Sequence, residues 1–288
     1  GPGIRTTVFL KGCNLRCGWC HNPETIHPKP ELQVRLARCI ACGACLEVCP
    51  RGAHTRLPGG QRHFDRQLCA GCGACARGCY AEALKVVGRE VTADEVIAEV
   101  LEDREFYASS GGGMTLSGGE PLMQREFTTE LLRLARQAGV HAAIETNLAW
   151  PWEHIEPVLA HTDLVMADIK VMDPKVHAEW TGVPNQRILD NIRRLAGKNL
   201  PMVVRTPVVP GVNDTAEDIG AIADFIAGMD NLQYYELLPY HPLGEDKYAS
   251  LGKECRVSDG CQWDRGKVKS LAAVARERGI RVRPSVEE

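Results

Sequence analysis

Three features that mark other classes of protein are missing from this sequence. No apolar run approaches the roughly 20 residues that a membrane-spanning helix needs. Neither sign of charge dominates, because 34 basic residues face 37 acidic ones and leave a net charge of −3; a broad nucleic-acid-binding face is therefore not expected. Cysteine is scarce after residue 79, where Cys255 and Cys261 are the only two. What remains is a globular composition whose 288 residues suit one large domain, or one domain with a small insert.

Cysteine is instead concentrated near the start of the chain. Eleven of the 13 cysteines lie between Cys13 and Cys79. Disulfides usually serve small secreted domains that lack a sufficient core, whereas a chain of this length can bury a large one. The clustered thiols are therefore interpreted as metal ligands. The sequence also opens on Gly1-Pro2-Gly3 without Met, so we expect further residues to precede Gly1.

Strands and helices are predicted to alternate along most of the chain. This alternation implies a parallel sheet, and the length favours a barrel or partial barrel over an open sheet, with the site at the carboxyl ends of the strands. Periodicity alone does not decide between a barrel and an open sheet. The predicted strands are 4–10, 114–117, 141–146, 163–169, 202–209, 233–238 and 280–283; the predicted helices are 92–108, 127–138, 152–160, 215–227 and 264–278, with a polar, partly helical stretch at 174–197.

Two identical cysteine runs lie between residues 30 and 88. Each has the spacing C-x2-C-x2-C-x3-C, first at Cys39, Cys42, Cys45 and Cys49, and then at Cys69, Cys72, Cys75 and Cys79. In bacterial ferredoxins the fourth cysteine of each run binds the other cluster. We therefore predict two [4Fe–4S] clusters, one held by Cys39, Cys42, Cys45 and Cys79 and the other by Cys69, Cys72, Cys75 and Cys49. Two zinc sites are the alternative, although zinc sites usually pair two separate C-x2-C knuckles.

The first cysteine group has a different spacing. Cys13, Cys17 and Cys20 form C-x3-C-x2-C, with no obvious fourth cysteine. Three thiolates on a four-iron cluster leave one iron with an open position, which is typical of catalytic rather than structural metal centres. A distorted structural site that uses His21 or a remote cysteine is the alternative.

The residues around this group resemble a known family. C-x3-C-x2-C at a strand end is similar to the radical S-adenosylmethionine superfamily. The opening stretch GPGIRTTVFLKGCNLRCGWCHNPE resembles the glycyl radical enzyme activating enzymes, of which pyruvate formate-lyase activase is the type, although an Asp normally precedes this Gly-Pro-Gly. The resemblance covers essentially the whole chain. It implies an α/β fold, a partial (β/α)6 TIM-like barrel with a ferredoxin-like two-cluster insert, divided as 1–29 (start of the barrel with the cluster loop), 30–88 (insert) and 89–288 (rest of the barrel).

The resemblance also implies a reaction. In the family, the open iron chelates the methionine part of S-adenosylmethionine, and one electron splits the S–C5′ bond. The resulting 5′-deoxyadenosyl radical abstracts a hydrogen atom from a backbone glycine of a partner enzyme. By this resemblance the chain is an oxidoreductase of the activating class, with Cys13, Cys17, Cys20 and Arg205 as catalytic residues.

Further motifs resemble the family's S-adenosylmethionine site. The resemblance assigns Gly118, Gly119 and Glu120, in Ser-Gly-Gly-Glu-Pro, to the amino group of the ligand. It pairs Lys170 with the ligand carboxylate, although a surface salt bridge to Asp168 is the alternative. His241, after Leu-Leu-Pro-Tyr, and Trp19, beside Cys20, are placed near the adenine. The alternatives are a polar residue without a ligand role for His241 and exclusion of water from the cluster for Trp19.

A monovalent cation site, for Na⁺ or K⁺, is also implied by the resemblance. Carboxylate and carbonyl oxygens suit a hard cation. The predicted donors are the side chains of Glu145 and Asp168 and the carbonyls of Thr146 and Met166. Glu145 stands where the type member has Asp, and Leu148 stands where Gly is common.

The resemblance implies protein partners. We expect a glycyl radical enzyme as the target and a flavodoxin or ferredoxin as the electron donor to the insert, with the chain itself a monomer in the cytoplasm of an anaerobe. Two alternatives stay open: a radical enzyme that acts on a small molecule or peptide, and an iron–sulfur electron carrier without catalysis. The second leaves Gly118, Lys170 and His241 without a role. Cys255 and Cys261 are assigned none.

Overall fold

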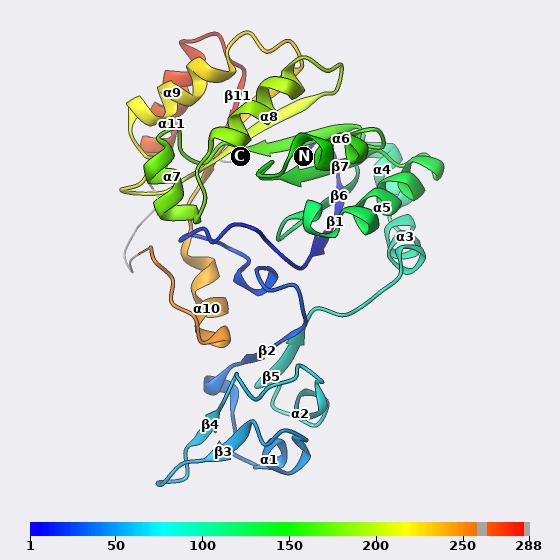
Figure 1. Cartoon of the computed structure of the whole chain (residues 1–288), viewed down its shortest axis with the longest axis vertical. Coiled ribbons are helices and arrows are strands. Elements are labelled where there is room, and N and C mark those ends of the chain that lie inside the picture. The colour runs from blue at the N-terminus through cyan, green and yellow to red at the C-terminus, as the bar shows by residue number, and fades with distance from the viewer. Residues whose placement is uncertain (258–263, 285–288) are drawn as a thin grey trace.

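The computed structural model describes residues 1–257 and 264–284. Its main body is one sheet of seven parallel strands in the order β1-β6-β7-β8-β9-β10-β11, with β1 and β11 as the edges in the described residues (Figure 1). The predicted parallel α/β fold is confirmed, and β11 makes the sheet one strand wider than a six-stranded barrel. The strands are β1 (Arg5–Leu10), β6 (Gly113–Gly118), β7 (Ala142–Thr146), β8 (Leu164–Asp168), β9 (Met202–Val208), β10 (Leu232–Pro239) and β11 (Val282–Pro284).

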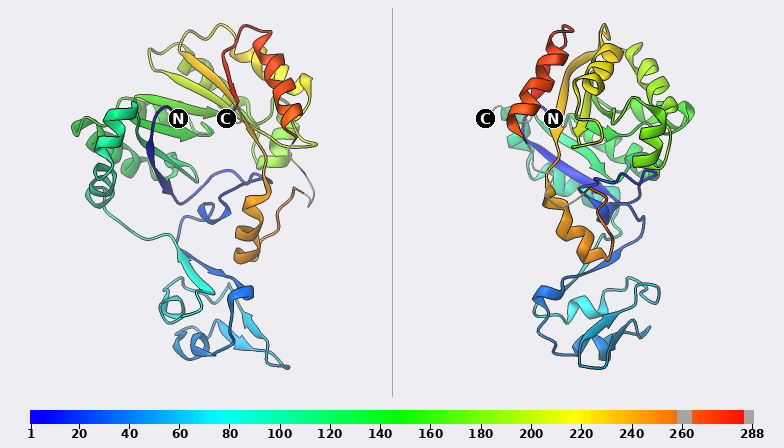
Figure 2. Two further views of the ribbon diagram at one scale, coloured as in Figure 1. Left: turned by 180° about the vertical axis from the view of Figure 1, so that it is seen from behind. Right: turned by 90° about the vertical axis from the view of Figure 1, so that its left-hand side faces the viewer.

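Helices pack on the outer face of this sheet (Figure 2). They are α3 (Ala93–Leu101), α4 (Arg104–Ser110), α5 (Arg125–Gln137), α6 (Trp152–Leu159), α8 (Gln186–Ala196), α9 (Ala216–Ile226) and α11 (Arg265–Arg276). Helix α7 (Pro174–Thr181) packs instead against the loop that follows β1. Capping boxes begin α3 at Thr92 and α9 at Thr215, as the side chains of these residues accept from the backbone three residues on. No helix in the described ranges is both long and apolar enough to cross a bilayer.

The two faces of the strands have different chemistry, because successive side chains point to opposite sides of a sheet. Outward side chains such as Met114, Ile144 and Val204 are almost fully buried against the helices and form the main core. On the inner face, Met166 and Val203 belong to a small apolar cluster. Charged side chains follow this cluster toward the carboxyl ends of the strands, so polar groups gather there.

Two predicted segments are divided in the structure. The helix predicted at 92–108 is wrong as one element: it breaks between α3 and α4, where the carboxylate of Asp103 accepts a hydrogen bond from Thr6 of β1 at 2.6 Å. The stretch 174–197 forms two helices, because Gly182 ends α7 in the left-handed region with φ +87°. A contact with another strand thus interrupts the helix predicted at 92–108, whereas α7 and α8 are the helical parts of the stretch predicted as partly helical.

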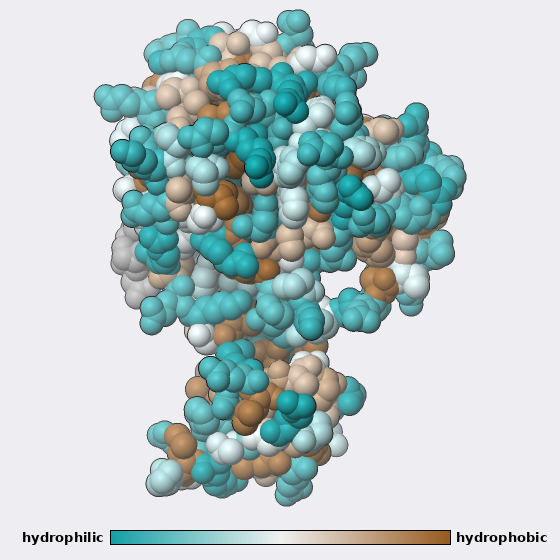
Figure 3. Space-filling view, viewed as in Figure 1, coloured by the Kyte–Doolittle hydropathy of each residue, from teal (hydrophilic) through white to brown (hydrophobic). Residues whose placement is uncertain are grey.

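A smaller lobe, from β2 to β5, lies beyond the carboxyl ends of the sheet strands (Figures 1 and 2). It contains two antiparallel strand pairs, β2 with β5 and β3 with β4, and two short helices that each carry a cysteine. Exposed hydrophobic side chains gather on it (Figure 3). Leu36 and Ile40 are among the exposed apolar residues of this segment. Its elements are β2 (Glu31–Val34), α1 (Ala44–Val48), β3 (His54–Arg56), β4 (Arg62–Phe64), α2 (Ala74–Arg77) and β5 (Leu84–Val87).

One helix between the barrel and the lobe was not predicted. Helix α10 (Glu245–Leu251) packs against β2 of the lobe and against the 3-10 helix η1 (Pro23–Thr25) after the first cysteine group. It is only seven residues long, and its apolar contacts come mainly from Tyr248 and Leu251. So short a pattern carries little helical signal in the sequence. The remaining 3-10 helices are η2 (Leu36–Arg38), η3 (Pro121–Gln124) and η4 (Pro242–Gly244).

Candidate active site

The loop that follows β1 is shaped by backbone hydrogen bonds. Gly12 N donates to the carbonyl of Thr25 at 2.7 Å, which closes the loop at its base. In its middle, Gly18 N donates to the carbonyl of Trp180 in α7 at 2.9 Å. The loop that carries the first cysteine group is therefore fixed at both its base and its tip.

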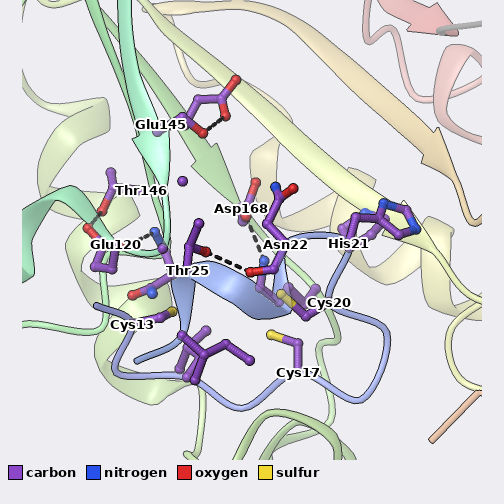
Figure 4. Close-up of a pocket in the computed structure, with 18 of the residues that line it drawn as sticks. Cys13, Cys17, Cys20, His21, Asn22, Thr25, Glu120, Glu145, Thr146 and Asp168 are labelled. Carbon is purple, nitrogen blue, oxygen red and sulfur yellow. Dashed lines mark hydrogen bonds and ion pairs between the residues drawn. The ribbon is translucent and has the colours of Figure 1, made fainter. Parts of the chain in front are cut away.

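The thiols of Cys13, Cys17 and Cys20 turn toward a common space at the carboxyl ends of the strands (Figure 4). Burial raises the pKa of Cys13 to about 12 and those of Cys17 and Cys20 to about 11. Thiols of this kind are poor free nucleophiles at neutral pH, whereas a coordinated thiol is deprotonated outright. Near them, the buried Nε2 of His21 has no hydrogen-bond partner in the described structure. Three converging thiols fit a cluster with three protein ligands.

The glycine pair at the end of β6, Gly118 and Gly119, allows the backbone to pack closely against β1 and the cysteine loop. Gly118 has φ +106°, and a Cβ there would lie 2.5 Å from the nitrogen of Leu10. A Cβ on Gly119 would lie 2.1 Å from the carbonyl oxygen of Gly12. Only glycine permits such close backbone approach. Glu120 N donates to the same carbonyl at 2.7 Å, so the motif lies directly beside the cysteines.

The carboxylate of Glu120 ties the ends of β6 and β7 together. It is almost completely buried and accepts from Thr146 Oγ1 at 2.8 Å, from Asn147 N at 2.8 Å and from Leu122 N at 3.1 Å. Burial raises its pKa to about 7, although these hydrogen bonds act in the opposite direction. Glu120 lines the cavity, and its hydrogen bonds hold the surrounding loops.

The loop after β7 has an unusual backbone at Leu148. This buried residue adopts φ +55°, in the left-handed region that glycine tolerates best. Such a conformation costs a non-glycine residue about 1–3 kcal/mol and persists only when its surroundings hold it. Here Asn191 Nδ2 donates to the Leu148 carbonyl at 2.9 Å. Leu148 thus adopts a backbone conformation that is typical of glycine.

Lys170 and Asp168 form an ion pair at the cavity wall. Lys170 Nζ lies 2.6 Å from Asp168 Oδ2, and the lysine is buried. Burial alone would lower the pKa of Lys170, but the Asp168 carboxylate and the nearby thiols outweigh it, so the pKa is raised and the lysine is charged. Both residues line the cavity; Lys170 is buried there, whereas the Asp168 side chain is 28% exposed.

A charged layer crosses the inner face of the sheet beside this pair. Arg205 Nη1 lies 2.5 Å from Glu145 Oε1, and Arg205 Nε lies 3.1 Å from Glu236 Oε2. Ser117 also donates to Glu145. Strand register places Asp168 beside Arg205 and Arg205 beside Glu236. The predicted cation donors Glu145 and Asp168 therefore both have cationic partners, while Met166 does not line the cavity and packs in the small apolar cluster.

The predicted adenine-side residues occupy different positions. Trp19 is buried and lines the cavity. His241 is exposed and does not line it; its ring stacks on His21 with centroids 3.9 Å apart, and His21 does line the cavity. Cys255, which has no assigned role, lies behind the loop with Sγ 3.8 Å from the Gly18 carbonyl. Cys261 lies outside the described residues.

The cavity joins side chains from most of the predicted motifs. Its empty volume is about 970 Å³, its open mouth included. Ser117 and Glu236 of the charged layer were not predicted from the sequence. The alternation of side chains along each strand could have identified them, because each lies on the inner face of its strand. His21 as a wall residue and Lys247 of α10, which has no motif, were not predicted either. The lining includes Cys13, Cys17, Trp19, Cys20, His21, Gly118, Gly119, Glu120, Glu145, Thr146, Asp168, Lys170 and Arg205.

The lobe has two further cavities lined by cysteines. The first is lined by Cys39, Cys42, Cys45 and Cys79, together with Cys75, and the second by Cys49, Cys69, Cys72 and Cys75. Arg62 Nη1 lies 3.9 Å from Cys45 Sγ, and the other two guanidinium nitrogens of Arg62 are buried without a hydrogen-bond partner in the described residues. A cluster with sulfur acceptors would satisfy them. No group of three or more His, Cys, Asp or Glu in the described ranges is arranged to hold a single metal ion.

Family comparisons agree with these observations. Residues 68–226, more than half of the chain, match the radical SAM superfamily. Residues 32–53 match the 4Fe-4S binding domain, and residues 1–42 match the 4Fe-4S single cluster domain. Iron–sulfur clusters and S-adenosylmethionine are the cofactors of such a chain. An electron carrier without catalysis does not account for the superfamily match.

Individual relatives are more specific. The chain is 46% identical to the isethionate sulfite-lyase activating enzyme of Oleidesulfovibrio alaskensis, over 90% of this chain and 85% of that relative. It is 39% identical to the (2S)-3-sulfopropanediol dehydratase activating enzyme of Klebsiella oxytoca, over 88% and 81%. A solved domain of the pyruvate-formate lyase-activating enzyme of Bacteroides vulgatus is 31% identical, with a TM-score of 0.51, over 60% of this chain and 99% of that one. The chain therefore belongs to the radical SAM superfamily, among the activating enzymes of glycyl radical enzymes.

Proposed function

We propose that this chain installs a glycyl radical on a partner enzyme, with an isethionate sulfite-lyase as the first partner to test. Three relatives with that activating function are 45–46% identical to the chain over 90% of its length. The observation that carries the proposal is one cavity in which three thiols, the Gly118–Glu120 motif and the Asp168–Lys170 pair meet.

Each group at this cavity has a proposed part in binding. Cys13, Cys17 and Cys20 hold a cluster which, with S-adenosylmethionine bound, supplies the one-electron cleavage that yields a 5′-deoxyadenosyl radical. Lys170 is charged and takes the ligand carboxylate. The backbone at Gly118 and Gly119, with Glu120, takes the amino group. Trp19, which lines the cavity, is placed on the adenine side. His241 is placed on the same side, outside the cavity wall and stacked on His21. Arg205 lies near the radical path.

A monovalent cation at Glu145, Thr146, Met166 and Asp168 remains part of the proposal. Both carboxylates are only partly exposed and lie on adjacent strands. Arg205 and Lys170 balance them in this structure. Na⁺ or K⁺ would share these oxygens, as is usual for a hard cation.

The lobe is proposed to carry the other two clusters. We divide the chain at 1–29, 30–88 and 89–288, with the middle segment as a ferredoxin-like insert. It would pass electrons from a flavodoxin or ferredoxin to the first cluster of a monomeric chain. The two cysteine-lined cavities support the crossed ligand sets, because Cys79 lies with the first run and Cys49 with the second.

The partner proposal is tested by activation under anaerobic conditions. The reconstituted chain is mixed with S-adenosylmethionine, a reductant and an isethionate sulfite-lyase, and the radical is followed by electron paramagnetic resonance. We expect a glycyl radical doublet and release of sulfite from isethionate. A choline trimethylamine-lyase serves as the second partner, and a lyase whose radical glycine is replaced by Ala is the control. Cleavage of S-adenosylmethionine without a radical on the sulfite-lyase would show that this partner is wrong.

The crossed ligand sets make a separate prediction. Cys79→Ala should remove the cluster that Cys79 is proposed to share with Cys39, Cys42 and Cys45, so iron falls from about twelve to about eight per chain. Adding Cys42→Ala should then remove no more iron, whereas adding Cys72→Ala should remove about four more. Iron and sulfide analysis of the reconstituted variants measures this. The opposite pattern would mean that each run holds its own cluster.

A further inference from the structure

Helix α10 contacts both the cysteine loop of the barrel and the lobe. On the barrel side, Lys247 Nζ donates to the carbonyl of His21 at 3.0 Å, to Asn22 Oδ1 at 2.9 Å and to Glu24 Oε1 at 2.6 Å. These three residues directly follow or lie close to Cys20. At the start of the helix, a Cβ on Gly244 would lie 3.3 Å from the Cα of His21. The helix therefore holds the end of the cysteine loop.

At its other end, α10 is held to the lobe by one arginine. Arg66 Nη2 donates to the carbonyl of Ser250 in α10 at 2.6 Å, and Arg66 Nη1 donates to the carbonyl of Leu32 in β2 at 2.9 Å. The guanidinium fork thus joins two chain segments that are far apart in the sequence. A Cβ on Gly252 would lie 2.8 Å from Arg66 Nε, so the arginine is packed closely against the end of the helix.

Arg66 also leads into the second cysteine run. The carbonyl of Arg66 accepts from the backbone nitrogen of Cys69 at 3.2 Å. Leu32, whose carbonyl Arg66 binds, lines the cavity that contains Cys69. One chain of contacts therefore runs from Cys69 through Arg66 and α10 to the residues after Cys20.

Two lysines also link the start of the lobe to the segment after Cys20. Lys253 lies 3.5 Å from Glu31 of β2 and donates to the carbonyl of Pro23 at 3.3 Å. Lys11, at the end of β1, lies 3.5 Å from Glu31 and donates to the carbonyl of Glu24 at 2.5 Å. Both lysines bind Glu31 and the segment after Cys20, so Glu31 joins the start of the lobe to this segment.

We propose that α10, with Lys247 and Arg66, is a bracket that fixes the cavity of Cys69, Cys72, Cys75 and Cys49 at a set distance from the Cys13, Cys17 and Cys20 site. This inference rests on the proposed function. In electron transfer across the junction, the lobe centre is oxidised by one electron and the barrel centre is reduced by one, and an external low-potential one-electron carrier restores the lobe. Arg66 and Lys247 are positioning residues. They act through α10 and the loops that they bind, and not by contact with the reacting groups.

The proposal is tested with Arg66→Ala in the reconstituted full chain. We expect three clusters as in the wild type, but a broader distribution of the distance between lobe and barrel centres by pulsed electron paramagnetic resonance. Amide hydrogen exchange should rise in residues 20–25 and 31–34. Cleavage of S-adenosylmethionine driven by a reduced ferredoxin should fall about tenfold or more, because small misplacements can cost up to about 10²-fold. Cleavage driven by a small reductant that reaches the barrel centre directly should stay near wild type.

Three further variants complete the test. Arg66→Lys, which can keep one of the two hydrogen bonds, should restore part of the ferredoxin-driven rate. Lys85→Ala removes the charge of an exposed lysine on β5 of the same lobe and should leave every readout unchanged. Lys247→Met breaks the barrel side of the bracket and provides the test should Arg66→Ala not fold; it should broaden the distance distribution in the same way.

Two results would overturn the bracket. One is an unchanged distance distribution and exchange pattern in both Arg66→Ala and Lys247→Met. The other is an equal fall of ferredoxin-driven and small-reductant-driven cleavage, which would place the damage at the cysteine loop itself. If the wild type failed to cleave S-adenosylmethionine, the proposed function would fail, whereas the distance and exchange measurements would still test the bracket.

Discussion

Cys17→Ala is expected to abolish cleavage of S-adenosylmethionine while the two lobe clusters still assemble. Cys17 lines the cavity with Cys13 and Cys20, and with only two of the three thiols the site cannot hold a cluster that keeps one open iron. Iron should fall from about twelve to about eight per chain, since each cluster holds four. Anaerobic reconstitution, iron analysis and an assay of 5′-deoxyadenosine measure both effects.

Cys255→Ala is the matched control for this variant. Cys255 is partly buried beside the same loop, 3.8 Å from the Gly18 carbonyl, and does not line the cavity. It should keep about twelve irons and wild-type cleavage. Retained cleavage in Cys17→Ala would contradict the assignment of an open iron at this site. A loss of clearly more than about four irons would show that assembly of the lobe clusters depends on the loop.

Lys170→Met is expected to weaken binding of S-adenosylmethionine by about 10- to 100-fold. A hydrogen bond to a charged group contributes about 1.5–3 kcal/mol, which corresponds to a change of this size in Kd. Lys170 is buried and charged at the cavity wall, so water cannot replace its ammonium group easily. Anaerobic equilibrium dialysis of the reconstituted protein gives the Kd, and iron analysis confirms that the clusters are intact.

The control for Lys170→Met is Lys175→Met, an exposed position in α7 with the same change of charge. Its Kd should match that of the wild type. A wild-type Kd in Lys170→Met would mean that the lysine serves only to balance Asp168, 2.6 Å away, and that the ligand carboxylate lies elsewhere.

Cysteine spacing predicted iron–sulfur ligation, and the resemblance of the surrounding residues to the activating enzymes implied the radical chemistry. The two ferredoxin-type runs and the C-x3-C-x2-C group follow from local sequence, because cluster ligands in tight loops are separated by fixed numbers of residues. The alternating pattern of strands and helices was equally local, and most predicted strands agree with the structure to within a few residues. Breaks such as that at Asp103 were missed, because they depend on a partner in another strand.

The contacts within the charged layer could not be predicted from local sequence patterns. Arg205 of β9 was predicted as a catalytic residue, but its pairing with Glu236, on the adjacent strand β10, and with Glu145, on β7 two strands away, was not predicted. Only strand order and register bring three such residues into contact. Similarly, the exposed stacking of His241 on His21 depends on how the end of β10 passes the cysteine loop.

The sequence by itself was enough to predict the family, through its resemblance to the activating enzymes, and to predict iron–sulfur ligation and the parallel fold, because cysteine spacing and the alternation of strands and helices are local patterns. Tertiary structure alone decided the depth of Lys170, the pairing of Arg205 and the position of α10 between barrel and lobe. These features depend on contacts between segments as distant in the chain as Arg66 and Ser250. No local pattern encodes such a contact, since its energy comes from groups that meet only after the chain has folded.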